Sequence, residues 1–61
     1  MEVQVFLIGK KEPIIYKGDR IDVLDFQLNG IKYKQVRRFR GGFSKSELLK
    51  SDLIKSIKTL S

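Results

Sequence analysis

The chain contains neither cysteine nor histidine. Without cysteine it forms no disulfide and no zinc site with cysteine ligands. Without histidine it lacks the usual general base near neutral pH, and cysteine is also missing as a nucleophile. The serines have no activating partner recognisable in the sequence, and 61 residues leave little volume for a substrate pocket. We therefore expect a protein that is not an enzyme and that binds neither a metal nor a cofactor.

Long hydrophobic runs are also missing. No apolar run approaches the roughly 18 residues that a membrane-spanning helix needs, so we expect no membrane partner. The start, MEVQVFLIGKKEP, has an acidic second residue and no small-residue cleavage site, and we interpret it as a mature N-terminus rather than a signal peptide. The absence of cysteine fits a cytoplasmic protein. A domain of this size and composition is typical of small bacterial or phage accessory proteins.

Acidic residues are scarce, and their distribution is uneven. The chain has 13 basic and 7 acidic residues, which gives a formal net charge of +6. Residues 31–45, IKYKQVRRFRGGFSK, contain six basic residues and no acidic one, whereas the segments before and after this block nearly balance. A concentrated block of positive charge indicates a polyanionic partner, such as nucleic acid or an acidic protein surface.

The clearest structural signal is Asn29-Gly30, which lies between two strand-like runs. Asn-Gly accepts the positive φ angles of a type I′ turn and is the strongest short-range signal for a β-hairpin. A two-residue loop fixes the register, in which Leu28/Ile31 and Phe26/Tyr33 join apolar residues and Asp25/Lys34 and Asp22/Arg37 join opposite charges. The predicted pairs are Leu28/Ile31, Gln27/Lys32, Phe26/Tyr33, Asp25/Lys34, Leu24/Gln35, Val23/Val36, Asp22/Arg37 and Ile21/Arg38.

The C-terminal third has the pattern of a helix. Ser44 and Glu47 have the spacing of a capping box, and Phe43 and Leu48 have the spacing of a hydrophobic staple. Gly41-Gly42 would form a flexible joint before it. The apolar residues that follow recur at helical spacing and predict one buried face, formed by Leu49, Leu53, Ile57 and Leu60 with Ile54 at its edge.

Together these signals predict an α+β fold in a single domain, 1–61. We expect strands at about 2–9, 14–17, 20–28 and 31–39 and a helix at about 45–60. The strands would form a small antiparallel β-meander of three to four strands, with the helix packed on it. The alternative is a small, partly open β-barrel of the same strands.

The basic block predicts a function in nucleic-acid binding. Alternation along a strand places Lys32, Lys34 and Arg38 on one face, at steps of about 6–7 Å or multiples of it, given a rise of about 3.3 Å per residue. Such a stripe suits phosphates, and nearby aromatic rings suit base stacking. The candidate contacts to nucleic acid or another polyanion are Lys32, Lys34, Arg37, Arg38, Arg40 and Lys45, and the candidate stacking residues are Tyr33 and Phe39.

Other interpretations of the same residues stay open. The basic and apolar surface would also suit a protein that inhibits or modulates a cellular protein with an acidic surface. A second copy of the chain would complete a core too small for one domain. Lysines on an edge strand also simply prevent unwanted strand pairing. The RGGF motif at 40–43 is more typical of a hinge than of an RNA-binding repeat, and Asp19, Asp22 and Asp25 are poorly spaced for a metal site on one strand face.

Overall fold

The protein is built almost entirely from β-strands. A computed structural model describes residues 1–60, which form two three-stranded antiparallel sheets with the strand orders β2–β1–β6 and β3–β4–β5. A short 3₁₀ turn, η1, leads into the last strand. The elements are β1 (Glu2–Leu7), β2 (Ile14–Lys17), β3 (Arg20–Leu28), β4 (Ile31–Arg40), β5 (Phe43–Lys50), η1 (Ser51–Leu53) and β6 (Ile54–Leu60).

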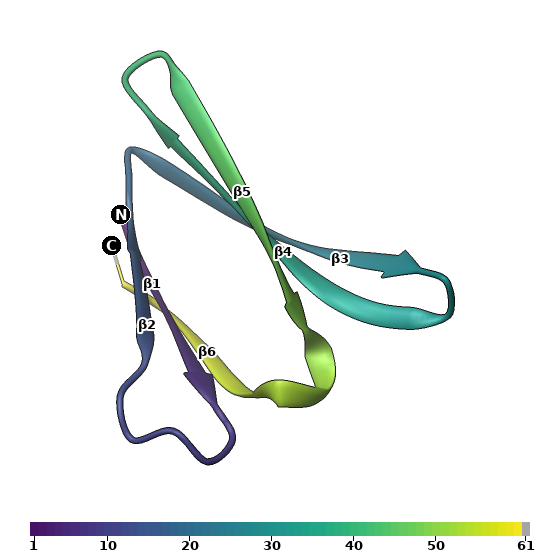
Figure 1. The fold of residues 1–61 in the computed structure, drawn as a ribbon. Helices are drawn as coiled ribbons and strands as arrows, with labels where there is room; N and C mark the ends of the chain where they lie inside the picture. The colour runs from purple at the N-terminus through teal and green to yellow at the C-terminus, as the bar shows by residue number, and fades with distance from the viewer. Residues whose placement is uncertain (61) are drawn as a thin grey trace.

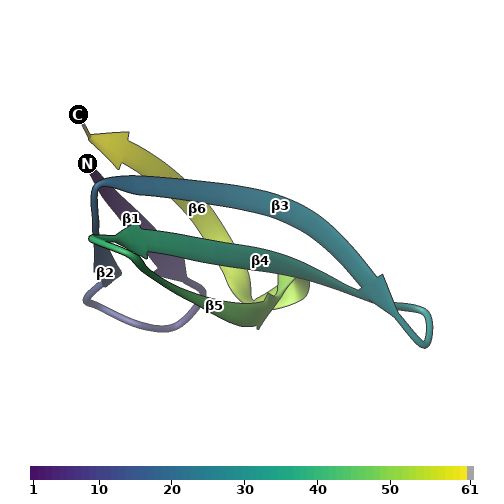
Figure 2. The same cartoon turned by 90° about the horizontal axis from the view of Figure 1, so that it is seen from above.

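The two sheets pack face to face and cross at an angle (Figure 1). The first and last strands lie side by side, so that the two ends of the described chain meet at one end of the molecule (Figures 1 and 2). The tip of the β3–β4 hairpin extends beyond the other sheet (Figure 2).

The core between the sheets is small. Among residues 1–60 five are buried, and they come from both sheets: Val3, Val5, Tyr16, Ile21 and Val36. Val3 and Val5 alternate with polar Gln4, as expected for a strand with one face turned to the core. Further apolar side chains pack around this centre while they stay half-exposed, namely Leu7, Ile14, Val23, Leu49, Ile54 and Ile57.

The predicted hairpin register is confirmed. The structure pairs β3 with β4 from Leu28/Ile31 to Ile21/Arg38, including each pair predicted from the two-residue loop, and adds Arg20/Phe39 at the far end. Asn29 and Gly30 adopt the positive φ angles of 52° and 78° that a type I′ turn requires.

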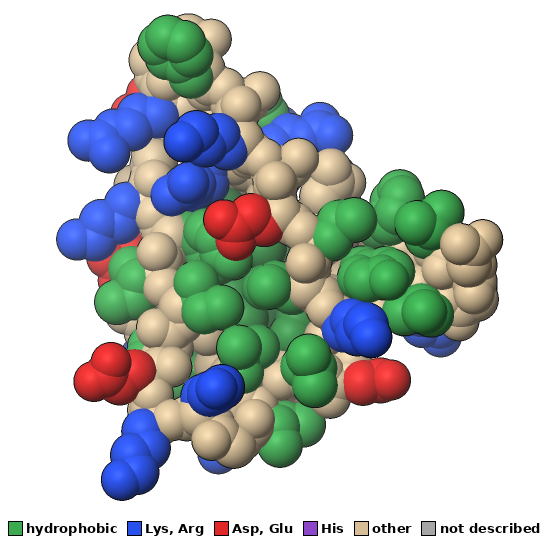
Figure 3. Space-filling model, in the orientation of Figure 1, with side chains coloured by type: hydrophobic (Ala, Val, Ile, Leu, Met, Phe, Trp, Pro, Cys, Tyr) green, Lys and Arg blue, Asp and Glu red, His purple; other side chains and the backbone are tan. Residues whose placement is uncertain are grey.

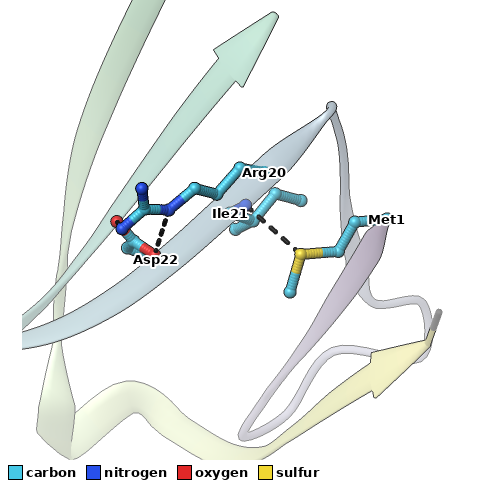
Figure 4. A network of polar contacts seen from close by, with 4 residues as sticks. All are labelled: Met1, Arg20, Ile21 and Asp22. Atoms are coloured by element: carbon cyan, nitrogen blue, oxygen red, sulfur yellow. Dashed lines mark hydrogen bonds and ion pairs between the residues drawn. The ribbon is translucent and has the colours of Figure 1, made fainter.

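Met1, the residue before β1, is tied to the start of β3, which links the two sheets. The backbone N–H of Ile21 donates to the Met1 sulfur at 3.3 Å, and beside it the Arg20 Nε donates to Asp22 at 3.2 Å (Figure 4). At the same corner the Gly18 N–H donates to the Met1 carbonyl oxygen. A Cβ atom on Gly18 would lie 3.0 Å from the Phe39 carbonyl oxygen, so this close crossing favours glycine.

The predicted C-terminal helix is wrong. Residues 43–50 form β5, which pairs with β4, and residues 54–60 form β6, which pairs with β1. The fold is therefore not α+β, because the described residues contain no α-helix. The four strands considered for the partly open barrel also omitted these two, which supply one strand to each sheet.

The helical spacing of the C-terminal apolar residues has another cause. Ile54 and Ile57 are three apart, which would normally place them on opposite faces of a strand. The register between β1 and β6 shifts at this point, so that Ile57 lies opposite Val5 and Ile54 opposite Leu7. The irregularity inserts one extra residue and returns both isoleucines to the core side. The bulge thus accounts for the spacing of Ile54 and Ile57, whereas Leu49 of the predicted helix face lies in β5 and Leu53 is an exposed residue of η1.

The predicted cap and staple are wrong for the same reason. Ser44 lies opposite Phe39 and Glu47 opposite Val36, both as members of β5. The carboxylate of Glu47 accepts a hydrogen bond from the hydroxyl of Tyr16, on the other sheet. Phe43 packs against no staple partner, because 82% of its surface is exposed.

Candidate anion-binding groove

Strand β4 presents its basic residues to two different environments. Val36 is buried, so residues of the same parity face the other sheet, and we call this side of β3–β4–β5 the inner face. Lys34, Arg38 and Arg40 share the inner face with Val36. The predicted stripe of bases is therefore interrupted by a core residue, which divides it into two ends.

At the hairpin end of β4 one of the two positive charges is paired with an acid. The ammonium group of Lys34 forms a hydrogen-bonded ion pair with Asp25, its predicted partner on β3. This hydrogen bond, with the positive charge of Lys34, lowers the pKa of the Asp25 carboxyl group. Lys32 lines the same depression as this pair.

At the opposite end of β4 the bases converge on a groove without an acid. The groove has a volume of about 350 Å³, and its lining comes from three strands and contains no carboxylate. Figure 3 shows Lys and Arg side chains gathered just below the β4–β5 turn. The lining residues are Lys17 of β2, Arg38 and Arg40 of β4, and Phe43 and Lys45 of β5.

Two of the four bases of this groove, Arg38 and Lys45, are poorly compensated, whereas Lys17 and Arg40 also border a neighbouring pocket that Glu2 and Asp19 line. Arg38 and Lys45 lie directly opposite each other on paired strands, an arrangement of like charges that destabilises a sheet. Within residues 1–60, neither of them nor Arg40 forms an ion pair. Lys17 forms one at 3.8 Å, with Glu2, while its side chain stays 71% exposed. The arrangement suits an anionic ligand that would supply the missing negative charge.

Tyr16 keeps the nearest carboxylate on β5 occupied. Its hydroxyl donates to Glu47 at 2.8 Å, and the guanidinium of Arg38 lies over its ring, 5.7 Å from the ring centre. Burial of the ring and the hydrogen bond to Glu47 raise the pKa of the Tyr16 hydroxyl. Tyr16 therefore holds Glu47 in a fixed position one row away from Arg38 and Lys45.

The remaining predicted site residues lie on the other side of the sheet, the outer face. Arg37 has the opposite parity to Arg38, and its predicted ion pair with Asp22 is not formed, because Asp22 pairs with Arg20. The stacking candidates also belong to this side. The Tyr33 ring lies 6.5 Å from the ring of Phe26, and the Phe39 ring lies 5.4 Å from the guanidinium of Arg20.

The structure thus brings together three of the six predicted basic residues, Arg38, Arg40 and Lys45, and separates them from Lys32, Lys34 and Arg37. Sequence reasoning missed Lys17 and Phe43. Lys17 lies 21 residues before Arg38 and on the other sheet, and only the packing of the two sheets brings them together. Phe43 was assigned to the hydrophobic staple of a helix that does not form.

The Gly41-Gly42 pair forms the β4–β5 turn, and Asp19 binds part of its backbone. The Gly41 N–H donates to the carboxylate of Asp19 at 3.0 Å, and Gly41 has a positive φ angle of 58°. The three aspartates of the sequence are thereby separated: Asp19 binds this turn, Asp22 binds Arg20, and Asp25 binds Lys34. Among residues 1–60, no three acidic side chains come close enough to hold a metal ion.

Comparison with known proteins gives no assignment. No protein-family model, no curated protein and no solved structure matches this chain. The part of the chain that the structure describes contains no helix long and apolar enough to cross a membrane.

Proposed function

We propose that the protein is a small, non-catalytic nucleic-acid-binding protein that holds phosphates in the groove between β2 and the β4–β5 hairpin. One observation carries the proposal: four basic side chains from three strands line a single groove that no carboxylate lines. Bases that were only a solvated face would have no reason to converge where their mutual repulsion is costly.

The spacing within the groove suits a phosphate chain. Arg38 and Arg40 are two residues apart on β4, which corresponds to about 6–7 Å. Lys45 lies opposite Arg38 on the adjacent strand, about 5 Å away. Each phosphate that these bases neutralise releases condensed counterions, so binding would depend steeply on salt and little on base sequence.

The test is a fluorescence-anisotropy titration with short single-stranded and duplex oligonucleotides at about 50 and 200 mM salt. If all four bases contact phosphates, this fourfold rise in salt weakens binding about 50-fold for a single strand and about 150-fold for a duplex. Binding that is independent of salt, or no binding at the lower salt, would contradict the proposal.

A second candidate function rests on the outer face. Five apolar side chains there are each between 39% and 50% exposed: Leu24, Phe26, Leu28, Ile31 and Leu48. Alternation places them on the same side of the β3–β4–β5 sheet. Figure 3 shows hydrophobic side chains gathered over the tip of the β3–β4 hairpin. Such a cluster is typical of surfaces that bind another protein, including a cellular target that the protein would inhibit or a second copy of this chain.

The two functions separate in a pull-down from nuclease-treated lysate. A protein that binds a cellular target retains that target at stoichiometric amounts, and Phe26→Ser on the outer face releases it whereas Arg40→Gln in the groove does not. Loss of all retained protein after nuclease treatment favours the nucleic-acid function instead.

A further inference from the structure

We propose that Phe43 is a platform for a nucleobase and that the groove therefore selects single-stranded over duplex nucleic acid. The inference rests on the proposed function, because the bases of the groove supply the phosphate contacts. It adds a ligand class that charge alone does not specify.

The exposure of Phe43 is the first observation. With 82% of its surface in solvent, it is more exposed than the other large apolar residues that lie open on this protein, which range from 39% to 61%. The ring therefore contributes little to the core. An aromatic ring held in water beside a ligand groove is available to a partner.

The neighbours of Phe43 are the second observation. Its partner in the register is Arg40, and both residues line the groove together with Arg38 and Lys45. A nucleotide has a flat aromatic base linked to an anionic phosphate. The groove presents the complementary pair, one exposed ring and adjacent cations, within about 350 Å³. This volume is at the scale of sites for small ligands rather than of a duplex.

Strandedness follows from the geometry of stacking. In a duplex both faces of each internal base are covered by neighbouring bases, so a protein ring stacks on them only after unstacking. In a single strand the base turns out at low cost and stacks on an aromatic side chain, with little preference among the four bases. Phe43 therefore adds affinity for a single strand and little for a duplex.

Tyr33 and Phe39 do not serve this purpose in the same groove. Both are on the outer face, where each ring already contacts a neighbour, Phe26 or Arg20. Neither lines the groove. The stacking function predicted for two aromatics of β4 is thus reassigned to one aromatic of β5.

An anionic membrane surface is the competing partner for an exposed ring among cations. Insertion into lipid would be favoured by several adjacent apolar side chains at the tip of the turn. Here Phe43 is preceded by Gly41 and Gly42 and followed by Ser44, so a single ring would have to insert. The ring also borders the groove rather than standing apart from it. Nucleic acid fits these residues better, and vesicles are included in the test.

The experiment is a thermodynamic cycle between Phe43 and the bases of the ligand. Wild type and Phe43→Ala are titrated by fluorescence anisotropy with a single-stranded oligonucleotide, an abasic strand of equal phosphate number, and a duplex. Leu53→Ala, at an exposed residue of η1 outside the groove, is the matched control. Because Phe43 is so exposed, its truncation should leave the melting temperature nearly unchanged.

We expect Phe43→Ala to weaken binding of the base-bearing single strand about 5- to 150-fold, the range for one stacked base. Binding of the abasic strand and of the duplex should change less than about twofold. The chain has no tryptophan, so Phe43→Trp adds a single fluorophore whose emission a stacked base should quench, while the abasic strand should not.

The outcomes separate the inference from the proposed function. Salt-dependent binding that Phe43→Ala leaves unchanged, or weakens equally for base-bearing and abasic strands, overturns the inference and leaves the proposed function standing. No binding of any oligonucleotide by the wild type overturns the proposed function itself. Binding to phosphatidylserine vesicles but not to oligonucleotides, lost in Phe43→Ala, overturns both in favour of a lipid surface.

Discussion

The two ends of β4 differ in what surrounds their charges rather than in how many charges they have. Near the hairpin tip, Lys32 and Lys34 share a depression with Asp25, which pairs with Lys34. At the other end, Arg38 and Arg40 line a groove without a carboxylate. Val36, buried in the core, separates the two ends. Both pairs of bases belong to one strand and one face.

From this difference we expect the neighbours of a basic residue to determine whether its charge is available to a ligand. An ion pair at the surface contributes little to stability, yet it satisfies the charge of the lysine locally. The groove end does the opposite, because it brings further bases, Lys17 and Lys45, toward the arginines. The basic residues that give the net charge of +6 are therefore not equally available to a ligand.

The largest expected effect comes from neutralising each end in turn. Arg40→Gln/Lys45→Gln should weaken nucleic-acid binding roughly 10- to 100-fold and lower the salt dependence by about two phosphate contacts. Lys32→Gln/Lys34→Gln removes the same charge from the hairpin end and should change affinity less than about threefold. Anisotropy titrations at two salt concentrations measure both. Thermal unfolding checks that each variant is folded, and equal losses from the two ends would contradict the comparison.

A smaller effect should follow from freeing the carboxylate next to the groove. Tyr16→Phe removes the hydrogen bond to Glu47, which should lower the free energy of unfolding by about 1 kcal/mol. The released carboxylate would then be able to pair with Arg38 or Lys45, which should weaken nucleic-acid binding by roughly two- to fivefold. Chemical denaturation and anisotropy measure the two effects separately.

The controls for this variant come from the chain itself. Tyr33→Phe removes a hydroxyl that makes no side-chain hydrogen bond within residues 1–60. This control should change neither the free energy of unfolding nor the affinity for nucleic acid. Adding Glu47→Gln to Tyr16→Phe should restore affinity but not stability. If Tyr16→Phe destabilises the protein but leaves its affinity for nucleic acid unchanged, then the hydrogen bond from Tyr16 does not serve to keep Glu47 away from the bases of the groove.

The sequence predicts the β3–β4 hairpin well because its signals are local. Asn29-Gly30 determines the turn, and the turn determines the register with β4 residue by residue. For residues 43–60 the local signals favoured a helix, and the tertiary structure overrode them. β5 and β6 instead pair with the backbones of β4 and β1, and the register shift beside Ile54 gives Ile54 and Ile57 a helix-like spacing.

The candidate site was predictable only where it lay within one strand. Alternation along β4 correctly groups Arg38 with Lys34, but it does not reveal that Val36 between them is buried. The contribution of Lys17 depends on how the two sheets pack, and that of Phe43 depends on the true course of the chain after Gly42. A charge block in a sequence locates a basic strand but not the groove that such a strand forms with its neighbours.

The smallest expected effect is a gain in affinity for nucleic acid. It should follow from removing the carboxylate of Asp25, which pairs with Lys34 at the hairpin end. Asp25→Asn should release Lys34 for a phosphate, which should raise affinity for a single strand up to about threefold and steepen the salt dependence by up to one contact. Asp52→Asn, at a carboxylate with no ion pair within residues 1–60, removes the same charge without releasing a lysine.

The pH dependence of stability provides an independent check on this pair. Since Lys34 lowers the pKa of Asp25 in the folded protein, the pair stabilises the protein above the ordinary carboxyl pKa of 3.8, and this contribution is lost as the pH falls through the folded pKa. The melting temperature of wild type should therefore slightly exceed that of Asp25→Asn at neutral pH and converge with it in acid. If the pH profile behaves this way while Asp25→Asn gains no affinity, then releasing the charge at the hairpin end is not sufficient. The two ends would then differ through the convergence of several strands and the ring of Phe43, and not through the pairing of Lys34.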